Sequence, residues 1–113
     1  MRAYLAALAL LAGAPAEAAV ATLNDYPTST RSDYVFACMK INGETRNALD
    51  QCSCSIDIIA SLLPYESYVS GETVASMNQD AGPIGRAFKA AQLAKDTLDT
   101  LLRAQAEAEV RCF

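Results

Sequence analysis

Residues 44–63, ETRNALDQCSCSIDIIASLL, combine a helical apolar repeat with two cysteines, and this stretch decides the expected fold. Its apolar side chains recur in steps of three and four, the spacing of one face of an α-helix. This first stripe comprises Leu49, Cys52, Ile56, Ile59 and Leu63. A second stripe comprises Cys54, Ile58 and Leu62. Two apolar stripes around one helix predict that it is the central and most buried helix of the fold.

Cys52 and Cys54 are two positions apart, so their side chains leave a helix about 200° from each other. Their sulfurs then point to nearly opposite faces, and the two cysteines cannot bond to each other without unwinding the helix. An even number of cysteines in a small exported chain is typical of a structural disulfide framework. We therefore expect Cys52 and Cys54 to bond Cys38 and Cys112, one each, which leaves two pairings open.

A shorter helix is expected before this segment. Residues 30–33, TRSD, form a capping signal, and apolar residues then follow at helical spacing as far as Ile41. The pair Asn42-Gly43 supplies the stop. A turn at this point folds the first helix back and brings Cys38 towards the level of the two central cysteines.

Two further helices are expected on the carboxyl side. Pro64 ends the central helix or opens the next one, which covers Tyr65–Gln79 with Gly71 as a kink or break. Pro83 starts a last helix that runs to about Arg111. Its apolar face comprises Ile84, Phe88, Ala91, Leu98, Leu101, Gln105, Ala108 and Cys112. The predicted fold is all-α: a small bundle of about four helices, pinned by two disulfides, with a long C-terminal helix.

The amino-terminal stretch has the order of a secretory signal peptide: one arginine, a short apolar run and small residues before a cleavage site. Cleavage after Ala18 or after Ala21 fits, so the signal peptide covers residues 1–21. Residues 22–32 read as an extended arm and residues 33–113 as the helical domain. The apolar run is too short to span a bilayer. We expect a periplasmic or secreted protein with no membrane span in its mature form.

Composition excludes several classes of site. The chain contains no histidine, so it has no Ser-His-Asp triad, no Cys-His pair and no His-ligated zinc. Its formal net charge of −4 argues against nucleic acid and anionic membranes as partners. Carboxylates without evident pairing, read as surface charges, include Asp57, Glu66, Glu72 and Asp80. These observations predict a protein that is not an enzyme and has no catalytic residues, no metal site and no cofactor.

The segment after the central helix contains the candidate binding residues. Tyr65 and Tyr68 follow Pro64 at a helix junction, and tyrosine is enriched at protein interfaces. The alternative is that both rings pack inward against the long C-terminal helix.

Three functions are compatible with this sequence. The first is an accessory or binding protein that contacts another periplasmic protein through a helical surface, as a small subunit of a larger complex. In its signal peptide, size, helical class and acidity the chain resembles small periplasmic acid-stress chaperones, and this resemblance implies a stress chaperone as an alternative. A third interpretation is soft-metal (copper) carriage or a redox role through Cys52 and Cys54, which needs free thiols.

Overall fold

The computed structural model describes residues 25–113. The expected signal peptide, its two cleavage sites and residues 22–24 of the expected arm lie outside the described residues. The regular structure of the described part is helical, in agreement with the predicted all-α class. It comprises five helices: α1 (Thr28–Asn42), α2 (Arg46–Leu62), α3 (Tyr65–Asn78), α4 (Pro83–Ala90) and α5 (Gln92–Cys112).

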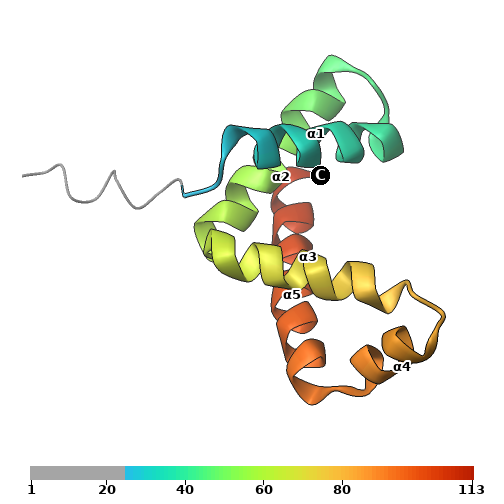
Figure 1. Ribbon diagram of the computed structural model, residues 1–113. Coiled ribbons are helices and arrows are strands. Elements are labelled where there is room, and N and C mark those ends of the chain that lie inside the picture. Colours follow the sequence, from blue (N-terminus) through green and yellow to red (C-terminus); the bar gives the residue numbers. More distant parts are fainter. Residues whose placement is uncertain (1–24) are drawn as a thin grey trace, which may run out of the picture.

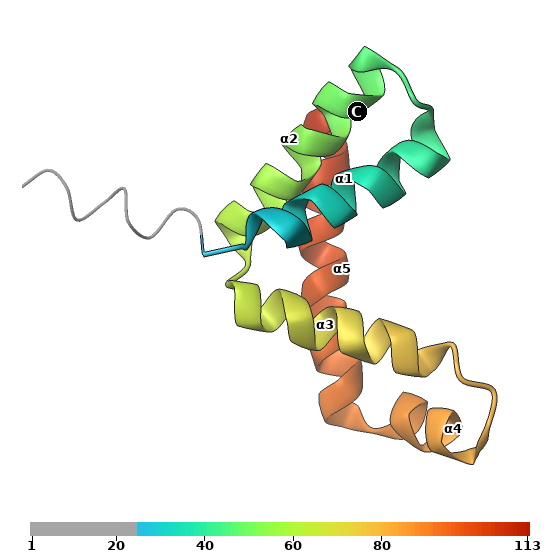
Figure 2. The same ribbon diagram turned by 45° about the horizontal axis from the view of Figure 1, so that its top comes forward.

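The long helix α5 connects the two ends of the molecule (Figure 1). Its C-terminal part lies against α2, its N-terminal part packs against α3, and α4 lies beside both α3 and α5. Helix α1 folds back along α2 in antiparallel fashion, and Figure 2 shows this pair at the opposite end of the molecule from α4. The turn between them contains Gly43, whose φ of 107° is a backbone conformation that favours glycine. The predicted stop at Asn42-Gly43 is confirmed.

Helix α2 supplies more buried residues than any other described helix, as its first stripe predicts, but the central position belongs to α5, which packs against α2, α3 and α4. The Thr45 hydroxyl caps it by accepting a 3.1 Å hydrogen bond from the Ala48 N–H. The first stripe is buried except at Leu49, which is half-buried. The second stripe is less buried than expected, because Cys54 and Ile58 are half-buried and Leu62 is 47% exposed. The residues that complete the core around α2 are Tyr26, Tyr68, Leu101, Ala104 and Ala108.

The predicted single C-terminal helix is wrong in one respect: it is broken at Ala91. This residue has φ −73° and ψ 126°, an extended conformation that ends α4 and precedes α5. The break allows α4 to fold back against α3, which a continuous helix from Pro83 to Arg111 could not do. Pro83 does begin a helix as predicted. The described residues therefore contain five helices where about four were expected.

Two other local predictions need correction. Helix α1 begins at Thr28, directly after Pro27, and no side chain caps it. Residues 28–32 of the expected arm are therefore helical. Gly71 causes no kink: α3 runs through it, and a Cβ at this position would lie 2.7 Å from the Cβ of Leu101. The glycine allows α3 and α5 to approach closely.

The two disulfides join Cys38 to Cys52 and Cys54 to Cys112, each with a Cα–Cα distance of 5.8 Å. The prediction that the two central cysteines have different partners is confirmed, and the structure selects one of the two open pairings. Structural disulfides indicate an oxidising, extracellular-type environment. Within residues 25–113, none of the helices combines the length and apolar character needed to cross a bilayer.

Candidate functional site

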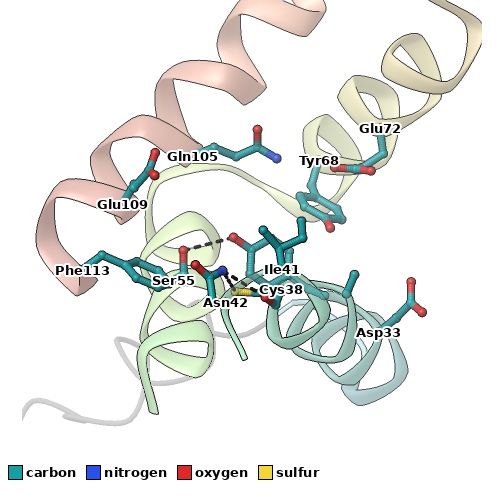
Figure 3. A pocket seen from close by; sticks show the side chains of 12 residues that line it. Asp33, Cys38, Ile41, Asn42, Ser55, Tyr68, Glu72, Gln105, Glu109 and Phe113 are labelled. Carbon is teal, nitrogen blue, oxygen red and sulfur yellow. Dashed lines mark hydrogen bonds between the residues drawn. The ribbon is translucent and has the colours of Figure 1, made fainter. Parts of the chain in front are cut away.

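A cleft of about 470 Å³ opens between α1, α2, α3 and α5 (Figure 3). Helices α1 and α2 form one side of it, and α3 and the C-terminal part of α5 form the other. The side chains that line the cleft include three carboxylates, three other polar groups and two tyrosine rings; the lining residues are Asp33, Tyr34, Ala37, Cys38, Ile41, Asn42, Ser55, Tyr68, Glu72, Gln105, Glu109 and Phe113.

The α1 wall of this cleft is held largely by polar and covalent contacts, since α1 contains no fully buried residue and only partly buried side chains, among them Tyr34 and Val35, pack against the core. The Tyr34 hydroxyl lies 3.0 Å from the hydroxyl of Ser55, a buried polar side chain of α2. The Cys38–Cys52 disulfide fastens the same wall further along. The Arg31 guanidinium donates to the Asp57 carboxylate at the other end of α1. These contacts hold α1 in position as one wall of the cleft, opposite the residues of α3 that also line it.

Three carboxylates face this cleft, one from each of three helices. Asp33 comes from α1, Glu72 from α3 and Glu109 from α5. The ion pairs found between described residues all use other carboxylates, and the lining of the cleft includes no Lys or Arg. Figure 3 places Asp33 and Glu72 towards one end of the cleft and Glu109 towards the other. The cleft therefore has uncompensated negative charge at both of its ends.

The surroundings of Glu72 show the effect of this charge. Burial raises the pKa of its carboxyl group above the ordinary value, and the nearby negative charge of Asp33 raises it further. Burial also raises the pKa of the Tyr68 phenol, and the Glu72 charge adds to this. A positive charge placed between Asp33 and Glu72 would favour the ionised carboxylates. The electrostatics of the cleft thus suit a cation.

The two tyrosines predicted as binding residues have different positions. Tyr68 is 8% exposed and belongs to the core, with only part of its side chain at the cleft. Tyr65 is half-buried, and its hydroxyl lies 3.2 Å from that of Thr30. Tyr68 therefore packs inward, as the alternative interpretation has it.

The partner of both rings is Tyr26, which the sequence analysis placed in an extended arm and did not single out. Its ring centroid lies 5.2 Å from those of Tyr65 and Tyr68. Its hydroxyl donates a 2.7 Å hydrogen bond to the Leu63 carbonyl, and burial raises its pKa to about 12. No periodic pattern surrounds Tyr26 in the sequence, so no local signal marks it as a core residue.

The carboxylate set was also missed from sequence. Glu72 was interpreted as a scattered surface charge, and neither Asp33 nor Glu109 was considered as part of a site. These residues are far apart along the chain and lie on different helices, so helical spacing carries no information about their proximity.

A second opening, lined by apolar and small side chains, lies between α3, α4 and α5 and has a volume of about 590 Å³. We call it the α3–α4–α5 groove. Ile84 and Leu93 at this groove are 66% and 79% exposed. The residues that line the groove are Val69, Ser70, Thr73, Val74, Ile84, Ala87, Phe88, Ala91, Leu93, Ala94 and Thr97.

The cysteines do not form a chemical site in this structure, because all four are in disulfides. Within the described part of the chain, no group of three or more Cys, Asp or Glu side chains is arranged to hold a metal ion. The copper interpretation needs free thiols on Cys52 and Cys54, and the structure assigns both to disulfides.

Comparison with protein-family models, with curated proteins and with solved structures finds no match.

Proposed function

We propose that this chain is a non-enzymatic binding protein of the periplasm or the extracellular space, and that its acidic cleft holds a cationic segment of another protein. The observation that carries the proposal is the set of three carboxylates, from three helices, that face one cleft without an ion-pair partner among the described residues. Export is supported by the signal-peptide pattern at the amino terminus and by the two disulfides.

The arrangement of the carboxylates favours a segment with at least two positive side chains. One cation would lie between Asp33 and Glu72, where it would offset the repulsion that raises the pKa of Glu72. A second positive side chain would contact Glu109 at the other end of the cleft. Aromatic rings of Tyr34, Tyr68 and Phe113 also line the cleft, and aromatic faces attract ammonium and guanidinium groups.

The test is calorimetric titration of the full mature chain with tetralysine at low ionic strength. We expect the single substitutions Asp33→Asn, Glu72→Gln and Glu109→Gln each to weaken binding by about three- to tenfold, the usual size of a partly exposed charge contact. Glu66→Gln is the matched control, because Glu66 lies on the same helix as Glu72 but outside the cleft. Equal binding by the wild type and by the triple cleft variant would refute the proposal.

The acid-stress chaperone is kept as a second candidate because of the exposed apolar groove between α3, α4 and α5. A chaperone of this kind exposes more apolar surface on acidification. It therefore predicts a large rise in the fluorescence of an apolar dye between pH 7 and pH 3. A flat dye signal across this range would eliminate it.

A further inference from the structure

The α3–α4–α5 groove has no charged residue among those that line it. Contiguous apolar openings of this kind on a small protein are typical of interaction sites. Its three walls are helices, and the exposed side chains of Ile84 and Leu93 stand at it. This geometry suits an amphipathic helix, which lays its apolar face into a groove and places anchors at i, i+3, i+4 and i+7.

The charge of the surrounding chain decides which helix fits best. Residues 81–95, which contain all of α4 and the start of α5, carry Arg86, Lys89 and Lys95 and no Asp or Glu. Residues 25–80 carry eight acids and three bases, and residues 96–113 carry four acids and two bases. The segment that builds two of the three groove walls is therefore net positive in a protein that is otherwise acidic.

The positive side chains lie near the groove but do not line it. Lys89 and Lys95 line a smaller cavity that shares Phe88 with the groove. Asp99 lines this cavity too, and its carboxylate is paired with Arg103 at 2.8 Å. A helix is about 10 Å thick, and the Debye length is about 30 Å at 0.01 M salt, so the potential of these lysines extends to the groove at low ionic strength. The acids at the two ends of the segment, Asp80 and Asp96, already accept hydrogen bonds from the Gly82 N–H and the Gln92 amide.

We infer that the α3–α4–α5 groove docks an amphipathic helix of a partner protein, with an apolar face and an acidic polar face. A helix is favoured over a lipid surface because the site is a groove between three helices, whose walls match the shape of a helix better than that of a membrane surface. The groove is lined by the start of α5, at Leu93 and Thr97, and the acidic cleft by its C-terminal part, at Gln105 and Glu109, so the two lie towards opposite ends of this helix. The inference therefore goes beyond the proposed function and does not depend on it.

The experiment uses the full mature chain and two designed amphipathic helical peptides, measured by fluorescence anisotropy. Both peptides carry the same leucine face; one has glutamates on its polar face and the other has lysines. We expect the glutamate peptide to bind, and Leu93→Asp or Ile84→Asp to weaken it by about tenfold or more, as expected when a charge is placed in an apolar contact. Neutralising both Lys89 and Lys95 with glutamine should weaken it by about threefold and reduce its salt dependence.

Val110→Asp is the matched control for the apolar substitutions. Val110 is 82% exposed on α5 and lies outside the groove, so its replacement should leave binding of the glutamate peptide unchanged. Circular dichroism checks that all variants keep their helices. If the lysine peptide binds in the acidic cleft, Leu93→Asp should leave its affinity unchanged. The experiment therefore distinguishes loss of binding at the groove from loss of binding at the cleft.

Three outcomes would overturn the inference. The first is that the glutamate peptide fails to bind, or binds as well to the Leu93→Asp variant. The second is that the protein binds vesicles of anionic phospholipid and that Leu93→Asp abolishes this binding, which would assign the groove to a lipid surface. The third is a dimer in analytical ultracentrifugation that the same substitution dissociates, which would assign it to a second copy of this chain.

Discussion

The two ends of the molecule are held together by different interactions. At the α1–α2 end, α1 buries no residue, and a disulfide, an ion pair and side-chain hydrogen bonds hold it to the rest. At the α3–α4–α5 end there is no disulfide, and glycine allows close packing of the backbone. Gly71 meets Leu101, and a Cβ on Gly85 would overlap the Asp80 carbonyl. Helix α1 contacts the core only through partly buried side chains such as Tyr34 and Val35, and it has covalent and polar ties as well, whereas α3 and α4 pack without a disulfide.

This difference also separates the two candidate surfaces. A wall held by polar and covalent ties borders a cleft in which carboxylates stand without ion-pair partners. The end of the molecule at which glycine allows close packing carries the apolar groove. The first surface suits a cationic segment, and the second suits an apolar one.

The largest expected effect is that of removing the disulfides of the α1–α2 end. The Cys54–Cys112 bridge closes a loop with a sequence separation of 58 and the Cys38–Cys52 bridge one of 14. Loop-closure entropy predicts that the Cys54→Ser/Cys112→Ser variant loses about 4 kcal/mol of unfolding free energy and Cys38→Ser/Cys52→Ser about 3. Chemical denaturation measures both losses.

Hydrogen exchange sharpens this comparison. In the Cys38→Ser/Cys52→Ser variant we expect the amides of α1 to lose more protection than those of α3 and α5, because α1 loses its covalent tie as well as its share of the global stability. Uniform loss of protection in all five helices would contradict the proposed division of the molecule into two ends.

The next effect concerns the close packing at the other end. Gly71→Ala places a Cβ 2.7 Å from the Leu101 Cβ, so α3 and α5 must separate. We expect a loss of about 2 kcal/mol in unfolding free energy, in the range of overpacked cores. Ser70→Ala on the same helix is the control and should be neutral or slightly stabilising, since alanine favours a helix. A fully stable Gly71→Ala variant would show that this contact is not tight.

A smaller effect is expected where the two ends meet, at Tyr26. Tyr26→Phe removes the donor to the Leu63 carbonyl and leaves a buried acceptor unpaired. Thermal or chemical unfolding should show a loss of about 1–2 kcal/mol. Tyr65→Phe serves for comparison, because its hydroxyl contact is longer and only partly buried. Equal losses for the two variants would argue against the special role of Tyr26.

The smallest effect has the opposite sign. Since the pKa of Glu72 is raised, the folded protein holds this proton to higher pH than the unfolded chain, and stability falls as pH rises above 4.5. Glu72→Gln removes this penalty, so we expect a gain of a few tenths of a kcal/mol at pH 7, a small value because solvent screens the exposed residue. The gain should vanish near pH 4.

Denaturation curves at several pH values measure this gain. Glu66→Gln is again the control and should show no such dependence on pH. A Glu72→Gln variant that is less stable than the wild type at pH 7 would mean that the carboxylate has a stabilising partner.

Several features of the fold were predictable because they depend on residues close together in the sequence. The stripe of α2, the stop at Gly43 and the start of α4 at Pro83 each follow from helical spacing or local backbone chemistry. The separate partners of Cys52 and Cys54 follow from two positions on one helix. Nothing local marks the break at Ala91, since no glycine or proline lies beside it.

The sequence by itself determined the helical class, the buried stripe of α2 and the presence of a disulfide framework, because periodicity and side-chain direction act over a few residues. Only the tertiary structure decided which cysteines pair, why Gly71 is needed, and that Asp33, Glu72 and Glu109 face one cleft. These features depend on the packing of α5 against α2 and α3. That packing brings together residues from distant parts of the chain, and no local pattern encodes it.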